Sequence, residues 1–168
     1  MRQDGAKWKE LTGWATLEGH WLRRKHFTPQ VLAQIAERIA QSERGHAGEL
    51  MLAIEGVSPA HERKSQLRAL EVFGRLRVWD TPLNTGVLLY LALDKHSIEL
   101  IADRGVAAPD LVWEGICEQL QIRLQHGDYV AGVLAAVDAI EKVLSMYSAP
   151  LPEGRSDSND LSNDPVML

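Results

Sequence analysis

Apolar residues recur along the chain in two patterns, one typical of helices and the other typical of buried strands. The first helical pattern begins at Thr28-Pro29, where a side chain that can cap a helix precedes a proline at the first helical position. Ile35 and Ile39 then follow at helical spacing. The pattern predicts a helix that ends near Gly45, because a residue without a Cβ suits a helix end.

Two continuous apolar runs, residues 49–55 and 87–93, are typical of strands that are buried on both faces. Between them a helical pattern extends from Pro59 to about Asp80. A strand, a helix and a second strand in this order predict a right-handed parallel unit. A short polar link then leads into a third apolar run, residues 98–102, which predicts an antiparallel hairpin.

Two more helical patterns complete the domain, one from Pro109-Asp110 to Gly127 and one that Asp128 caps. From residue 150 the composition changes to Pro, Gly, Ser, Asn and Asp with little to bury, which predicts disorder. The fold class is therefore α/β. We expect a three-layer α/β/α sandwich with a small mixed sheet, built from the parallel unit and the hairpin.

Length and charge divide the chain into three regions. Its 168 residues suit a single domain, which we place at 27–148, between a Trp-bearing basic arm over 1–26 and a disordered acidic tail over 149–168. The acidic domain makes nucleic acid an unsuitable partner. The first residues lack the apolar core of a signal peptide, and no stretch has the apolar length of a membrane span, so we expect a cytoplasmic protein without a transmembrane segment.

Five short motifs between Arg68 and Val143 resemble, in this order, the TPM domains of bacterial proteins. The motifs are Ala69-Leu70-Glu71-Val72-Phe73, Val78-Trp79-Asp80-Thr81, Asn84-Thr85-Gly86-Val87-Leu88-Leu89-Tyr90, Ala102-Asp103-Arg104-Gly105 and Gly127-Asp128-Tyr129-Val130-Ala131-Gly132-Val133. The resemblance implies a twisted sheet between helices. It also implies a poorly defined accessory role, since calcium binding, weak phosphatase activity and support of photosystems or receptors have been proposed for relatives in thylakoid lumen and bacterial envelopes.

The sequence departs from that family in two respects. Many relatives carry a signal peptide and a membrane anchor, and we expect neither in this sequence. The double carboxylate-amide that precedes the Gly-Val-Leu strand in the family is reduced here to Asn84 with Thr85. The envelope location and the metal site of the family therefore do not transfer directly to this chain.

The predicted topology places several polar residues at one edge of the sheet. If 49–55 and 87–93 are parallel and 98–102 runs back, two strands begin and one ends at that edge. Five polar residues should lie there, namely Glu49, Asp80, Asn84, Asp103 and Arg104. The first four carry the hard oxygen atoms that calcium and magnesium prefer as ligands. A competing interpretation assigns Asp80 and Asn84 to turn geometry, Asp103 to a pair with Arg104 or to the cap of a local turn, and Glu49 to a solvated strand end.

Catalysis has less support in the sequence than binding. No nucleophile with an activating base can be assembled, and the six histidines form no i,i+4 pair for zinc. Arg104 beside Asp103 can hold a phosphate, which makes a weak metal-assisted phosphatase the alternative function. The opposite end of the sheet, with Ser58, Glu55 and Asp94, is a second location, but it has no residue placed as a base.

The N-terminal arm carries three tryptophans, Trp8, Trp14 and Trp21, among lysines and arginines. One hypothesis is an interaction module that binds a partner protein or lies peripherally on an anionic membrane. The alternative is that the arm packs back on the acidic domain, which its opposite charge favours. Gly13 and Gly19 weaken a continuous helix in this segment.

Overall fold

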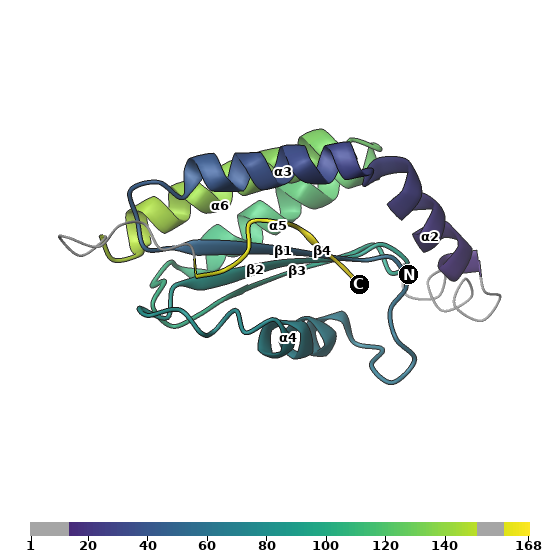
Figure 1. Cartoon of the computed structure of the whole chain (residues 1–168). Coiled ribbons are helices and arrows are strands. Elements are labelled where there is room, and N and C mark those ends of the chain that lie inside the picture. Colours follow the sequence, from purple (N-terminus) through teal and green to yellow (C-terminus); the bar gives the residue numbers. More distant parts are fainter. Residues whose placement is uncertain (1–13, 151–159) are drawn as a thin grey trace.

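The computed structural model describes residues 14–150 and 160–168. Its helices are α2 (Trp14–His26), α3 (Pro29–Ser42), α4 (Ser65–Arg75), α5 (Asp110–Gln125) and α6 (Tyr129–Tyr147). Its strands are β1 (Glu49–Glu55), β2 (Gly86–Ala92), β3 (Ser97–Ala102) and β4 (Val166–Met167). Helices α3, α5 and α6 lie on one face of the sheet and α4 lies on the other, while α2 lies at one end (Figure 1). The predicted α/β/α sandwich is confirmed.

The sheet has the strand order β3-β2-β1-β4. Strands β1 and β2 pair in parallel with Glu49 opposite Gly86, and β2 and β3 form an antiparallel hairpin with Val87 opposite Ala102. Both predicted units are therefore present. β2 is a central strand, as its uninterrupted apolar sequence indicates.

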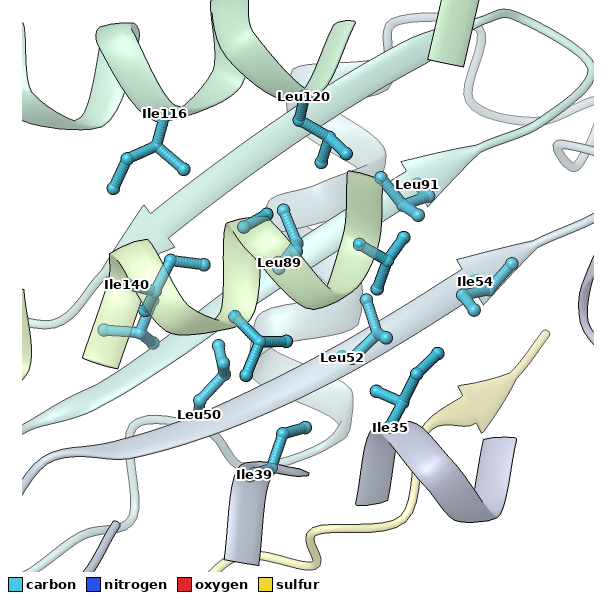
Figure 2. Packing of buried hydrophobic residues seen from close by; sticks show 14 of the residues in the cluster. Ile35, Ile39, Leu50, Leu52, Ile54, Leu89, Leu91, Ile116, Leu120 and Ile140 are labelled. Carbon is cyan, nitrogen blue, oxygen red and sulfur yellow. The ribbon is translucent and has the colours of Figure 1, made fainter. Parts of the chain in front are cut away.

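Alternation along β1 and β2 sends side chains to two separate cores. On the side of α3, α5 and α6, Leu52 and Leu89 lie in a large apolar cluster that also contains Ile140 of α6 (Figure 2). On the α4 side, Met51 and Tyr90 join a smaller cluster. Because both faces of these strands are covered, every position of β1 and β2 is buried.

Two helices differ from the sequence pattern. The helix between β1 and β2 begins at Ser65, later than Pro59. The residues between them form turns, in which the Glu62 N–H donates to the Pro59 carbonyl over 3.3 Å and Lys95 Nζ donates to the Arg63 carbonyl over 2.6 Å. Helix α2 runs continuously through Gly19, where an added Cβ would lie 1.9 Å from the Gly56 carbonyl oxygen. Close packing therefore explains this glycine. Ala15 and Leu22 are buried, so α2 packs on the domain as the second interpretation expected.

The predicted disorder of the tail is wrong for residues 160–168. This segment lies along β1, where β4 pairs in parallel with Ala53 opposite Val166. Leu161 is buried in the cluster on the α4 side. A few isolated apolar residues are enough here, because a ready-made strand and an apolar surface already receive them. Residues 151–159 of the predicted tail lie outside the described residues.

Candidate functional site

Three strand ends meet at one edge of the sheet, as the predicted topology required. The backbone N–H of Glu49 donates to the Thr85 carbonyl over 3.2 Å, and the N–H of Asp103 donates to the Gly86 carbonyl over 2.9 Å. The starts of β1 and β2 and the end of β3 therefore lie side by side. The prediction that these ends share an edge is confirmed at the level of the backbone.

Two loops at this edge are locked together, the one before β2 and the one after β3. Gly105 N–H donates to the Asn84 carbonyl over 2.7 Å, and Arg104 Nη2 donates to Asn84 Oδ1 over 3.2 Å. A Cβ on Gly105 would lie 2.2 Å from the Leu83 carbonyl oxygen and 2.4 Å from that of Asn84. Asn84 itself has a φ of 54°, a left-handed conformation that asparagine tolerates. The loop pair thus gathers several oxygen atoms in a small space.

Asp103 supplies the negatively charged group of this loop pair. Its Oδ1 accepts the N–H of Arg104 over 2.7 Å, while its Oδ2 is buried without a hydrogen-bond partner. A buried carboxylate oxygen without a partner is costly, since nearly all buried polar atoms in proteins are satisfied. One carboxylate oxygen of Asp103 is therefore left without a hydrogen bond from the described residues.

The other two predicted ligands, Glu49 and Asp80, have different partners. Glu49 is 8% exposed, and its carboxylate accepts the backbone N–H groups of Asp160, over 3.2 Å, and of Leu161. Burial raises the pKa of Glu49 to about 7, while those two hydrogen bonds act in the opposite direction. Asp80 is exposed and forms an ion pair with Arg77. Within residues 14–150 and 160–168, no group of three or more His, Cys, Asp and Glu side chains is placed to hold a metal ion.

A buried polar network occupies the opposite end of the sheet. Glu55 accepts two hydrogen bonds from Arg68, at 3.0 and 2.6 Å, and a third from the hydroxyl of Tyr90. Burial and the contact with Glu55 raise the pKa of Tyr90. Asp94 accepts the backbone N–H and the hydroxyl of Ser58, over 2.9 and 2.8 Å. These acids are satisfied by the protein itself, which indicates a structural role for this end.

Another buried acid, Glu141, was not identified from the sequence. Glu141 of α6 accepts a hydrogen bond from His46 Nε2 over 3.0 Å, and its other oxygen has no partner. The His46 tautomer follows from its neighbours, because Nδ1 accepts the N–H of Gly48 and Nε2 must then carry the proton. Burial raises the pKa of Glu141. The two residues are 95 positions apart, so no local pattern reveals them.

The tryptophan-bearing arm is described in part. Trp8 lies outside the described residues and Trp14 begins α2. Trp21 is 55% exposed, with the Lys25 ammonium 4.3 Å from its ring centre, and Leu17 one turn earlier is 71% exposed. A partner-binding role for this face stays a prediction. None of the helices that the structure describes combines the length and apolar character needed to cross a membrane.

The fold and this edge define a small α/β/α domain with a mixed sheet. Residues 23–143 match the TPM domain, and the chain belongs to the TPM domain family, which confirms the resemblance of its motifs. Among solved structures it is similar to the BA42 protein of the psychrophilic bacterium Bizionia argentinensis, with 23% identity and a TM-score of 0.72, over 83% of this chain and 94% of that one. At this identity the likeness shows the fold alone. A comparison with curated proteins found no match.

Proposed function

We propose that this TPM domain is an accessory binding module that takes a divalent cation at the loop pair formed by Leu83, Asn84, Asp103 and Gly105. The observation that carries the proposal is the buried Oδ2 of Asp103, which has no hydrogen-bond partner. A cation bound there would compensate the buried carboxylate oxygen that lacks a hydrogen bond.

The loop pair offers the oxygen atoms that such a cation prefers. Asp103 provides a carboxylate and Asn84 an amide oxygen, and the carbonyl groups of Leu83 and Asn84 converge on Gly105. Calcium accepts carboxylate, amide and backbone oxygens together and completes its shell with water, whereas magnesium keeps more water. Arg104 contacts Asn84 Oδ1 from the exposed side, and a cation bound to Asn84 would replace that contact.

Thermal unfolding in the presence of a chelator, then with calcium or magnesium at 1 mM, tests the proposal. A Kd of about 0.1 mM would stabilise the native state by about 1.4 kcal/mol at that concentration. For a chain of this size the Tm would rise by about 3 to 5 °C. Asp103→Asn should abolish the increase, since it removes the only carboxylate of the proposed site.

Two matched variants locate the site. Asp80→Asn and Glu49→Gln alter the other two predicted carboxylates, which are held by Arg77 and by the 160–168 backbone. Both variants should keep the full cation response. Loss of the response in these variants but not in Asp103→Asn would move the site away from the loop pair, and no response in the wild-type protein would reject cation binding.

The same edge supports a second candidate function, a weak metal-assisted phosphatase. The observation that favours it is the exposed guanidinium of Arg104, next to Asp103, because arginine binds phosphate oxygens in a two-pronged manner. Hydrolysis of p-nitrophenyl phosphate with magnesium tests it. Turnover that Arg104→Ala and Asp103→Asn both abolish would support this reaction, and turnover unaffected by either variant would exclude it.

A further inference from the structure

Residues 160–168, here called the edge segment, lie against β1 in the manner of a bound peptide (Figure 1). Ala53 pairs with Val166 and Ile54 with Met167 in parallel register, and the N–H of Leu168 donates to the Ile54 carbonyl over 2.9 Å. Strand addition of this kind is a common mode of peptide recognition, in which backbone pairing gives affinity and side-chain pockets give specificity.

The first two residues of the edge segment are bound by a buried acid. Glu49 accepts the N–H groups of both Asp160 and Leu161. Hydrogen bonds from backbone amides to a carboxylate are charge-assisted and therefore strong. The Leu161 side chain is 7% exposed and lies in the α4-side cluster with Met51 and Val72. The surface along β1 that receives the edge segment is here called the groove. At this end it buries one apolar side chain, and Glu49 accepts two consecutive backbone amides.

The far end of the groove is contributed by α2. Arg23 Nη1 donates to the Leu168 carbonyl over 3.3 Å, and the side chains of Val166 and Leu168 pack against the α4-side cluster. Met167 packs on the opposite face, against the large cluster. The groove therefore has an acidic end, an apolar middle and a basic end, in that order along β1.

Two observations distinguish the edge segment from the domain that receives it. It follows the family match, which covers residues 23–143, and only two of its residues form a strand. In addition, the Asp160 carboxylate lies near Glu49 and repels it, which contributes to the raised pKa of Glu49. The segment therefore places a second carboxylate beside the group that binds it, and a ligand without that carboxylate would avoid the repulsion.

We propose that the outer edge of β1 is a docking groove for an extended peptide of a partner protein, and that the edge segment fills this groove until such a peptide displaces it. The partner peptide runs parallel to β1. It presents two free amides to Glu49, a leucine-like side chain at the place of Leu161, and an uncharged or basic residue at the place of Asp160.

Fluorescence anisotropy with labelled nonapeptides tests this groove in the full chain. The probes are the sequence of residues 160–168 and the same peptide with Asp160→Asn. The receptor is the full chain with Leu161→Asp and Val166→Asp, which loosen the edge segment and leave the groove intact. We expect both peptides to bind this variant, with the Asp160→Asn peptide at least threefold tighter, and to bind the wild-type chain at least tenfold more weakly, because the tethered segment competes.

A matched pair of acids tests the assigned contact. In the loosened chain, Glu49→Ala should weaken peptide binding tenfold or more, whereas Glu37→Ala, an exposed acid on α3, should leave it unchanged. Equal binding by the two variants would overturn the assignment of Glu49. Failure of both peptides to bind a loosened chain that keeps its native circular dichroism would overturn the groove. Concentration-dependent dimers of the wild-type chain that the peptides dissociate would instead assign the groove to the edge segment of a second copy.

Hydrogen exchange in the wild-type chain gives an independent answer that needs no variant. The amides of Leu161 and Leu168 should exchange at least a hundredfold faster than the amides that join β1 to β2, since release of the edge segment does not require the domain to unfold. Exchange of all these amides at a common, globally limited rate would make the segment an integral part of the fold and would reject a displaceable occupant.

Discussion

Arg68 of α4 and Glu55 of β1 form a two-pronged ion pair inside the protein, with Nε and Nη2 lying 3.0 and 2.6 Å from the two carboxylate oxygens. Arg68 is 5% and Glu55 3% exposed. Water no longer solvates two charges this deep, so they are stabilised by each other, by the Tyr90 hydroxyl on Glu55 and by the Glu71 carboxylate, which lies 2.9 Å from Arg68 Nη1. The pair is therefore sensitive to loss of either partner.

Arg68→Met should destabilise the protein by about 3 to 5 kcal/mol, because it leaves the Glu55 carboxylate buried and uncompensated. Urea unfolding followed by circular dichroism measures this loss. Arg38→Met is the matched control, since Arg38 makes the same two-pronged contact with Asp138 at the surface, with 2.6 and 2.7 Å distances. The control should cost far less, and equal losses in the two variants would contradict the role assigned to burial.

Stability should fall as the pH rises through about 7, because of Glu49. Burial raises its pKa in the folded protein from 4.5 to about 7, with a smaller contribution from the nearby Asp160 carboxylate. A raised carboxyl pKa means that the folded state binds the proton more tightly than the unfolded state. The stabilisation is thus complete below about pH 4.5 and is lost through pH 7, by at most about 3 kcal/mol.

Urea unfolding at pH 5 and pH 8 measures this dependence. Glu49→Gln removes the titrating group and should flatten the difference between the two pH values. Glu141 also has a raised pKa and contributes in both proteins, so comparing the two slopes isolates Glu49. An unchanged slope in Glu49→Gln would assign the pH dependence to other groups, and Glu37→Gln serves as the exposed control.

Gly105→Ala should destabilise the loop pair at the candidate cation site. The new Cβ would lie 2.2 and 2.4 Å from the carbonyl oxygens of Leu83 and Asn84, which are backbone atoms and cannot turn aside. We expect a loss of about 2 kcal/mol or more and a weaker cation response. Gly115→Ala is the control, because its Cβ would meet no neighbour and it should add about 0.5 to 1 kcal/mol of helix stability. Thermal unfolding of both variants checks the contrast.

The fold could be predicted from the sequence to the extent that local patterns determine it. The uninterrupted apolar runs of β1 and β2 have few alternatives to central strands, and the polar link before β3 leaves room only for a hairpin. β4 has no such pattern. Val166 and Met167 form a strand only because Ala53 and Ile54 offer unpaired backbone groups beside them.

The candidate site was predictable in its position but not in its contacts. Topology alone brings Glu49, Asn84 and Asp103 to one edge, and the register agrees. The hydrogen bonds of Glu49 depend on a segment more than a hundred positions away in the sequence. No local sequence pattern predicts that this segment packs there. The Arg68 and Tyr90 contacts with Glu55 were missed for a similar reason, since an arginine on a helix and a tyrosine in a strand are ordinary surface or core residues until tertiary packing joins them.

The distance in sequence between Glu49 and Leu161, 112 positions, also determines when this contact can form. Closing so long a loop costs chain entropy that one short segment cannot offset, whereas β1 and β2 are joined by a much shorter connection. The sheet must therefore be assembled before residues 160–168 find their place, and their contacts belong to the final stage of folding. Destabilising substitutions in this segment would then increase the unfolding rate and leave the folding rate almost unaltered.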